Sequence, residues 1–183
     1  MKKGSLNRQV VLEQALLRAS EGGFSKLTYN GLARSLNVQP QSLYRYVDNI
    51  ADVKGGVVAL YIKKLTESLY HDLLPYSGKE ALHQLAVLFV SYTAVGLPFT
   101  DMVGGLTAYA NDQHVKQEMD QLRDLSTKLV AAVTNDKENI DKNEQLFLNF
   151  IVGNLALVTA GAPDKIENHK IFEENIDRLL SLF

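Results

Sequence analysis

The segment 40–47 is rich in side chains that can form hydrogen bonds. Its polar and aromatic members are Gln41, Ser42, Tyr44, Arg45 and Tyr46. Gln41 and Arg45 are four residues apart, so in a helix they would lie on one face. Arginine can donate two parallel hydrogen bonds to a guanine edge, and glutamine can pair with an adenine edge in the same way. These residue types at this spacing therefore predict that Gln41 and Arg45 read DNA bases.

Two short helices joined by a tight turn are expected to position this segment. The first would cover residues 29–36, behind Thr28 as its capping residue. Asn37, in the turn 37–39, tolerates the left-handed conformation that reverses a chain after a helix. Pro40 suits the first turn of the second helix, where its missing N–H needs no partner. This order of helix, turn and polar helix is typical of a DNA-reading helix-turn-helix.

Hydroxyl groups at both helices could bind the DNA backbone. Tyr44 and Tyr46 can donate to phosphate oxygens, and so can Thr28 and Tyr29 at the start of the first helix. The alternative is that Tyr44 is mainly a core residue and that Arg45 is an ordinary solvated charge. The complete set of expected DNA contacts is Thr28, Tyr29, Gln39, Gln41, Ser42, Tyr44, Arg45, Tyr46 and Lys54.

The net charge of −2 is unevenly distributed along the chain. Residues 1–56 contain eight Lys or Arg and four Asp or Glu, a net charge of +4. Residues 57–183 contain the other 11 basic and 17 acidic residues, a net charge of −6. A basic N-terminal third is consistent with a phosphate-binding domain on an acidic body, and chance fluctuation in composition is the alternative.

The composition excludes several other classes of protein. The 183 residues include no cysteine, which excludes disulfides, thiolate metal sites and cysteine nucleophiles and fits a reducing compartment. The N-terminus has two lysines but no apolar stretch of signal-peptide length behind them. No run of about 18 apolar residues, the length of a transmembrane helix, occurs anywhere. We therefore expect a soluble cytoplasmic protein that does not contact a membrane.

Apolar residues recur at intervals of three and four along the chain, and no convincing strand pattern occurs. We expect an all-α fold of about nine helices, with a three-helix helix-turn-helix domain in residues 1–49 and a helical domain in residues 50–183. An amphipathic helix over 50–74 would span on the order of 35 Å and connect the two. Gly22–Gly23 should end the first helix, and 134–142 should form a polar loop. The other helices are expected over 5–21, 79–96, 100–110, 112–133, 142–160 and 167–182.

The search for catalytic groups finds one pattern, Glu80-x-x-His83. Di-iron helical bundles use this spacing, but they need a second copy and two further glutamates, and the chain has no second copy. Glycine-rich phosphate loops and a Ser-His-Asp arrangement are also absent. We expect no enzyme activity, catalytic residue, cofactor or metal. The competing interpretation is a helical ligand- or metal-binding bundle or enzyme in which the helix-turn-helix is incidental.

A family resemblance extends over much of the N-terminal third. Residues 10–47 read VVLEQALLRASEGGFSKLTYNGLARSLNVQPQSLYRYV. This stretch resembles, without a gap, the DNA-binding domain of the TetR family of transcriptional repressors. The Gly23–Phe24 corner and the Leu43-Tyr44-Arg45 sequence carry the likeness. The later segments FIVGNLALVTAG and FEENIDRLLSLF look like the last two helices of a TetR branch with a Trp-His-Gly signature, of which only Gly153 is present.

The resemblance implies a repressor that binds a palindromic double-stranded DNA operator as a homodimer. It also implies that the second domain dimerises through its last two helices and encloses a pocket for a small, largely apolar effector that releases the DNA. The alternatives are that these helices are intramolecular core, and that the protein assembles or activates without a ligand. The expected dimer contacts are Phe150, Gly153, Leu157, Ala160, Ile176 and Leu179. The expected effector contacts, each of which could equally be core, are Phe89, Tyr92, Thr93, Met102, Leu106, Tyr109 and Met119.

Two features after the helix-turn-helix bear on this expected mechanism. The family usually has a lysine beside a phosphate at the position of Ile50, and only Lys54 is close enough to replace it. Gly55–Gly56 interrupts the predicted connector helix, where each glycine costs about 1 kcal/mol relative to alanine. We expect this pair to absorb the helix tilt that an effector would cause.

Overall fold

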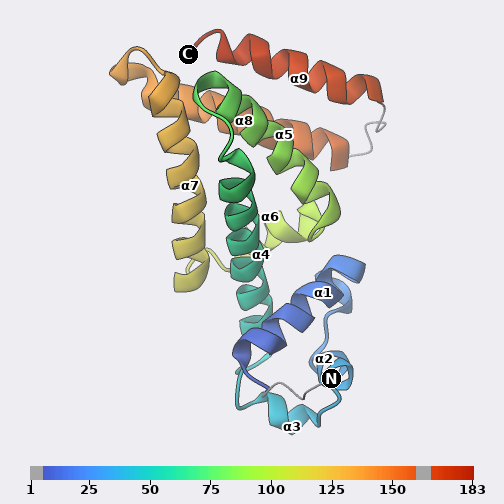
Figure 1. The fold of residues 1–183 in the computed structure, drawn as a ribbon. Helices are drawn as coiled ribbons and strands as arrows, with labels where there is room; N and C mark the ends of the chain where they lie inside the picture. The colour runs from blue at the N-terminus through green and yellow to red at the C-terminus, as the bar shows by residue number, and fades with distance from the viewer. Residues whose placement is uncertain (1–5, 160–165) are drawn as a thin grey trace. The chain divides into compact units, whose positions relative to one another are not determined.

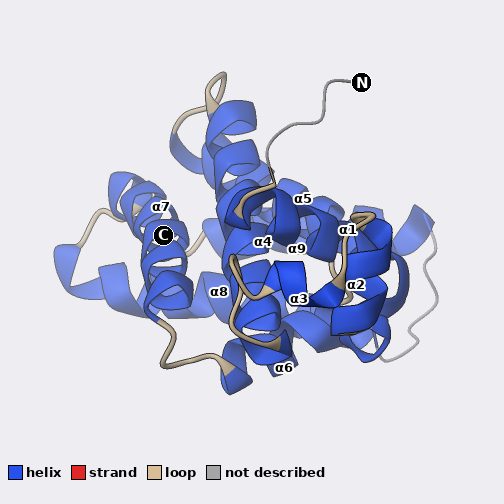
Figure 2. Ribbon diagram, turned by 90° about the horizontal axis from the view of Figure 1, so that it is seen from below, coloured by secondary structure: helices blue, strands red, loops and turns tan. Residues whose placement is uncertain are grey.

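The computed structural model describes residues 6–159 and 166–183, and every regular element in these ranges is helical (Figures 1 and 2). The described residues form nine α-helices and one short 3-10 helix, which confirms the predicted all-α fold. The elements are α1 (Arg8–Lys26), α2 (Tyr29–Ser35), α3 (Pro40–Leu43), α4 (Ile50–Leu73), α5 (Gly78–Val95), α6 (Phe99–Ala108), α7 (Gln113–Val133), η1 (Lys137–Asn139), α8 (Ile140–Thr159) and α9 (Ile166–Leu180).

The contacts divide the chain into two units, each built from separate segments. Unit 1 comprises Met1–Lys64 and Val95–Met119, and unit 2 comprises Leu65–Ala94 and Asp120–Phe183. Unit 1 therefore contains α1, α2, α3 and α6, while unit 2 contains α8 and α9. The predicted domain boundary after residue 49 stays a prediction.

The first helix begins and ends through local chemistry. The Asn7 side chain accepts a hydrogen bond from the Val10 N–H at 2.9 Å, which satisfies one of the free donors at the start of α1. Gly23, with φ 73°, interrupts the helical backbone, and one further turn continues to Lys26. Glycine adopts this left-handed φ without a steric penalty. The predicted end at Gly22–Gly23 is therefore a kink inside α1.

The three N-terminal helices share a small apolar core. Leu12, Leu27, Leu32, Leu43 and Val47 are buried, whereas Leu16, Phe24, Leu36 and Val38 are half-buried. The start of α4 completes this core with Val53, Val57 and Val58, which are fully buried. Each fully buried Leu or Val side chain contributes about 1.5–3 kcal/mol. The helix-turn-helix therefore depends on α4 for a large share of its stabilisation.

Gly55 and Gly56 allow side chains to approach α4 closely. A Cβ atom on Gly56 would lie 2.7 Å from Cδ2 of Leu12, and one on Gly55 would lie 3.2 Å from Cδ1 of Tyr109. Alanine at position 56 would therefore require the Leu12 side chain of α1 to shift. Whether the glycine pair absorbs a helix tilt stays a prediction.

Unit 2 is held together by a core and by contacts between α5 and α9. Leu82, Phe147 and Ile176 are fully buried in this unit. Lys79 Nζ donates to the Leu180 carbonyl at 2.7 Å. In the predicted polar loop 134–142 the structure has η1, and α8 begins earlier than expected, at Ile140.

Candidate nucleic-acid interface

The turn between α2 and α3 has the predicted geometry. Thr28 Oγ1 accepts the Gly31 N–H at 3.1 Å and so caps α2. Asn37 adopts the left-handed conformation with φ 54°, and Pro40 is in the first turn of α3. The Ser42 N–H donates to the Gln39 carbonyl at 2.9 Å. Figures 1 and 2 show α2 and α3 as neighbours in both views.

The second helix is shorter than predicted. Regular α3 ends at Leu43, and the chain continues through a turn at 44–46. The Leu43 carbonyl accepts both the Tyr46 N–H at 2.8 Å and the Val47 N–H at 3.0 Å. The backbone is therefore still wound after α3, although the described helix does not extend to residue 47.

The predicted base-reading residues are available for contact. Gln41 and Arg45 are exposed, and within the described part of the chain no hydrogen bond or ion pair occupies either side chain. Gln39 is also exposed, and its side chain makes no capping hydrogen bond to α3. Tyr44 is 62% exposed, so the alternative that it is a core residue is wrong.

Tyr29 and Tyr44 brace the two helices against each other. Their ring centroids are 4.9 Å apart, and the Tyr29 hydroxyl donates to the Val47 carbonyl at 3.3 Å. Burial raises the pKa of the Tyr29 phenol, and nearby Tyr44 adds to the shift. The phenol therefore remains a hydrogen-bond donor at neutral pH. The predicted phosphate contacts of the two side chains stay predictions.

Arg8 holds the turn after α3 against the start of α4. Its guanidinium donates to the two carboxylate oxygens of Asp52 at 2.5 and 2.9 Å, and to the Tyr46 carbonyl at 3.0 Å. Asp52 also accepts the Asp48 N–H at 2.9 Å. The hydrogen bond from Arg8 lowers the pKa of the Asp52 carboxyl. Sequence patterns did not identify this pair, because its members are separated by 44 residues.

Lys54 and Ile50, at the start of α4, bear on the expected phosphate contact. The Lys54 ammonium lies 5.7 Å from the centre of the Phe24 ring, a distance typical of a cation–π interaction. Ile50 is half-buried at the first position of α4, behind Asn49, whose side chain accepts the Ala51 N–H at 2.8 Å. The predicted phosphate contact of Lys54 stays a prediction, and in this structure its ammonium faces an aromatic ring.

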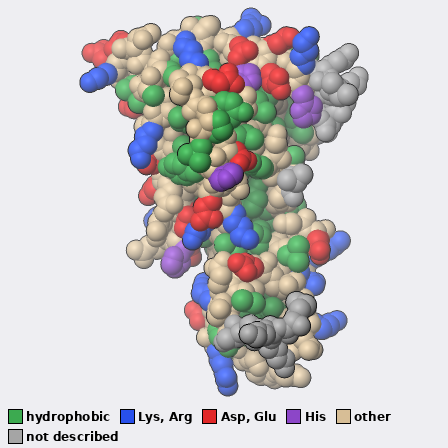
Figure 3. Space-filling view, in the orientation of Figure 1, with side chains coloured by type: hydrophobic (Ala, Val, Ile, Leu, Met, Phe, Trp, Pro, Cys, Tyr) green, Lys and Arg blue, Asp and Glu red, His purple; other side chains and the backbone are tan. Residues whose placement is uncertain are grey.

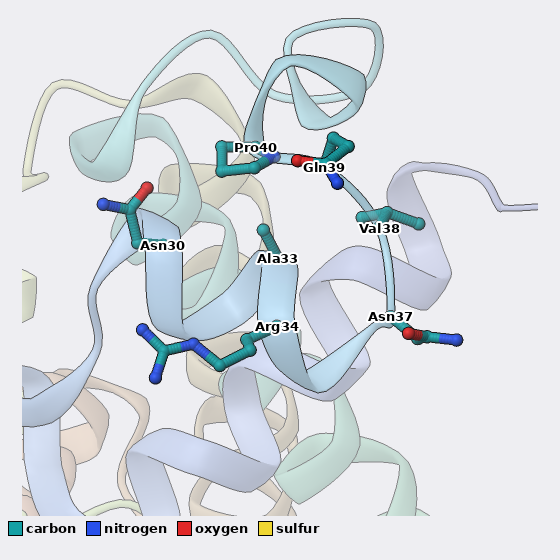
Figure 4. Close-up of a pocket in the computed structure, with 7 residues that line it drawn as sticks. All are labelled: Asn30, Ala33, Arg34, Asn37, Val38, Gln39 and Pro40. Atoms are coloured by element: carbon teal, nitrogen blue, oxygen red, sulfur yellow. The ribbon is translucent and has the colours of Figure 1, made fainter.

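A groove of about 570 Å³ runs between α2 and the start of α3 (Figure 4). Exposed Asn30 and Arg34 are one turn apart on α2 and extend to the same side (Figure 4). We did not predict either as a contact residue, although polar residues at this spacing, opposite buried Leu32 and Ala33, were a usable signal. The groove is lined by Asn30, Ala33, Arg34, Asn37, Val38, Gln39 and Pro40.

The predicted effector contacts belong to both units. Phe89, Tyr92 and Thr93 are in unit 2, whereas Met102, Leu106, Tyr109 and Met119 are in unit 1. The Tyr92 hydroxyl donates to the Asp72 carboxylate, and Thr93 Oγ1 donates to the Phe89 carbonyl at 2.9 Å. Burial raises the pKa of the Tyr109 phenol. Their contact with an effector stays a prediction.

Tyr61 is a further polar side chain that the sequence search overlooked. It is buried on α4, and its hydroxyl has no hydrogen-bond partner among the described residues. Burial raises the pKa of Tyr61 to about 12. Its ring lies against Gly96, where a Cβ atom would be 2.5 Å from Cε2. An unpaired buried hydroxyl costs about 1–3 kcal/mol.

The predicted dimer contacts differ in exposure. Leu157 and Gly153 on α8 are exposed, whereas Phe150 is half-buried and stacks on Phe172 with 5.4 Å between ring centroids. Leu179 is half-buried, and Ala160 lies outside the described residues. Ile176 is fully buried in the core of unit 2, so its side chain offers a partner no surface.

Glu80 and His83, on which the metal-bundle alternative rests, have other partners. His83 Nδ1 lies 2.7 Å from Asp177 Oδ1, and Glu80 accepts a hydrogen bond from Gln84 at 3.0 Å. No group of three or more His, Cys, Asp or Glu in the described ranges could hold a metal ion. This geometry favours a structural role for both side chains.

No single helix in the described part of the chain has both the length and the apolar character to cross a membrane. The bent pair Gly78–Ala94 and Phe99–Ala108 meets these criteria together, by length and composition only.

Comparison with known proteins identifies similarity only at the level of structure. No protein-family model and no curated protein matches the sequence. A protein of unknown function from Rhodococcus sp. RHA1 has a TM-score of 0.83 and 14% identity, with 98% of this chain and 96% of that chain covered. SCO7222, a TetR from Streptomyces coelicolor, has a TM-score of 0.64 and 13% identity, with 96% and 88% covered.

A TetR variant from Acinetobacter baumannii AYE, in complex with minocycline, has a TM-score of 0.64 and 17% identity, with 97% of this chain and 93% of that chain covered. These alignments extend along nearly the whole of each chain, beyond the helix-turn-helix. The chain therefore has the fold of the TetR family of transcriptional regulators.

Proposed function

We propose that this chain is a TetR-family transcriptional repressor, and not an enzyme, that binds a palindromic operator as a homodimer. We further propose that a small, largely apolar effector releases it from DNA. The observation that carries this proposal is the pair Gln41 and Arg45, which are exposed and have no partner among the described residues. Side chains with this hydrogen-bonding capacity and no intramolecular partner suit an external, polar target.

DNA recognition would divide between base edges and phosphates. Arg45 would donate to guanine and Gln41 would pair with adenine in the major groove. Hydroxyl groups such as that of Thr28 would bind phosphates and set the register without reading sequence. Two such helix-turn-helix units must lie about 34 Å apart to enter successive turns of the major groove, which explains the proposed dimer and palindrome.

Exposed apolar side chains on α8 and α9 support self-association. Leu157 is 66% exposed on α8 and Ile171 is 53% exposed on α9, and Leu146, Val152 and Val158 on α8 are also exposed. Hydrophobic side chains reach the surface over the helices of unit 2 (Figure 3). Gly153 has no neighbouring atom within 4 Å of its potential Cβ, so a second helix can approach closely there. A second copy of this surface is the proposed partner.

Helix α6 supplies a route from effector to DNA. The Asp101 carboxylate accepts the Phe24 N–H at 2.8 Å, and a Cβ on Gly105 would lie 3.2 Å from the Phe24 ring. The same helix carries Met102 and Leu106, two predicted effector contacts. An effector that binds one position of α6 better than another would shift the population of helix-turn-helix positions. We propose this as the basis of release.

Selection of bound sequences from random DNA tests the proposal. The wild-type protein should enrich a palindrome, and Arg45→Ala should lose discrimination of about 1–3 kcal/mol at one symmetric pair of positions. Arg123→Ala, which removes an exposed arginine from α7 in unit 2, is the matched control and should select the wild-type sequence. Failure of the wild-type protein to enrich any palindrome would overturn the repressor proposal.

The effector requires a separate experiment. Compounds that raise the thermal midpoint of the free protein should be tested for release of the selected operator. A largely apolar compound that does both would support the ligand-responsive mechanism. If stabilising compounds never change operator affinity, the protein acts on DNA without an effector.

A further inference from the structure

Arg18 is a half-buried cation on α1, and no described residue supplies it with an anionic partner. Its Nη2 lies 3.3 Å from the point that a Cβ atom on Gly31 would occupy, and Thr28 Oγ1 lies 2.8 Å from the same point. Its Nε is buried and has no hydrogen-bond partner. Among the described residues, no carboxylate forms an ion pair with it. The guanidinium therefore lies beside the capping residue of α2, and no described carboxylate is paired with it.

The sequence position of Arg18 makes this charge unexpected. Val11, Ala15, Arg18 and Gly22 follow the spacing of one helix stripe, and Val11 and Ala15 are fully buried. An apolar side chain would satisfy such a position at no electrostatic cost. A partly buried charge loses part of its hydration, and an anion that binds from outside would compensate for that loss.

We propose that Arg18 binds a phosphate of the DNA backbone, together with the Thr28 hydroxyl. Thr28 Oγ1 accepts the Gly31 N–H at 3.1 Å, which leaves its hydroxyl proton free for a phosphate oxygen. Gly31 has no side chain to separate the two groups. A guanidinium can donate two parallel hydrogen bonds to a phosphodiester. This inference rests on the proposed function and adds a contact from α1 to it.

The test is the salt dependence of DNA binding by the full-length Arg18→Met variant. Methionine replaces arginine by an unbranched apolar side chain and so removes the charge. The probes are a labelled duplex with the selected palindrome and a scrambled duplex. Each lost phosphate contact should reduce the slope of log K against log salt by about 0.9, and affinity at about 0.1 M salt should fall roughly eightfold per protomer on both duplexes. Arg18→Lys should retain most of the slope.

The thermal stability and the base preference of Arg18→Met distinguish a phosphate contact of Arg18 from a structural role. Because an uncompensated charge is removed, Arg18→Met should unfold at the wild-type temperature or above it. It should also select the same palindrome, since phosphates carry no base information. Arg123→Met removes the same charge from exposed α7 and should leave the slope unchanged.

The outcomes distinguish this inference from the proposed function. A folded Arg18→Met protein with the wild-type salt slope would overturn the phosphate contact. Loss of folding in both Arg18→Met and Arg18→Gln would overturn it as well, because Arg18 would then be a structural residue. If the wild-type protein binds neither duplex, the proposed function itself fails.

Discussion

At the scale of single residues, the candidate interface depends on charges that are either fully paired or fully free. Arg8 and Asp52 satisfy each other through two hydrogen bonds and hold the backbone of the turn after α3. Arg45 is exposed and has no such partner in the described part of the chain. This difference separates a residue that positions the interface from one available to a ligand.

The Arg8–Asp52 pair gives a pH-dependent prediction. The pKa of Asp52 is lowered in the folded protein. Its contribution to the free energy of unfolding is therefore fully present above the ordinary pKa of aspartate, and it is lost as pH falls through the pKa of the folded state. At about pH 7, Asp52→Asn should reduce the free energy of unfolding by about 1–2 kcal/mol. Below about pH 3 the free energies of unfolding of Asp52→Asn and wild type should become more similar.

Urea unfolding across this pH range measures the effect. Asp124→Asn breaks a solvent-exposed pair with Lys128 on α7 and should change stability little. If Asp52→Asn lowered the free energy of unfolding by the same amount at every pH, the lost contact would not be that of an ionised carboxylate.

At the scale of elements, two glycines in α6 have different environments. A Cβ on Gly105 would lie 2.6 Å from Val58 Cγ2, whereas a Cβ on Gly104 would have no atom within 4 Å. The first glycine therefore sets the approach of α6 to α4 and to Phe24. The second is exposed within a helix.

This contrast predicts opposite effects of the same substitution. Gly105→Ala should reduce the free energy of unfolding by about 1–3 kcal/mol through overpacking. Gly104→Ala should raise it by about 0.5–1 kcal/mol, because alanine favours the helix. Denaturant midpoints for the two variants provide the comparison. Equal effects would mean that α6 does not pack closely on this face.

At the scale of the whole molecule, the proposed operator binding requires a second copy of the chain. The exposed apolar side chains of α8 and α9 are the surface available for it, and Leu157 is the most exposed of those on α8. The fold shared with TetR regulators and the exposed helix-turn-helix both fit this assembly.

Leu157→Glu should weaken dimerisation, because burying an unpaired carboxylate costs about 2 kcal/mol or more, equivalent to at least about thirtyfold in the dissociation constant. Operator affinity should fall with it. Leu74→Glu, at another exposed leucine beyond the end of α4, is the control. Sedimentation at several concentrations measures both. A stable Leu157→Glu dimer would place the interface elsewhere.

The sequence by itself determined the helical class and the helix-turn-helix, because the signals are local. Thr28 caps the helix that follows it, Asn37 supplies the left-handed turn, and Pro40 starts the next helix. Each of these acts within about one turn of backbone, so spacing along the chain is sufficient to recognise it.

Only the tertiary structure decided which distant residues meet. Asp101 binds the Phe24 N–H across 77 residues, and Arg8 binds Asp52 across 44. The Leu12 side chain lies where a Cβ on Gly56 would be, and no described carboxylate is paired with Arg18. Such contacts arise from the packing of one helix on another. No periodicity along the chain encodes their partners.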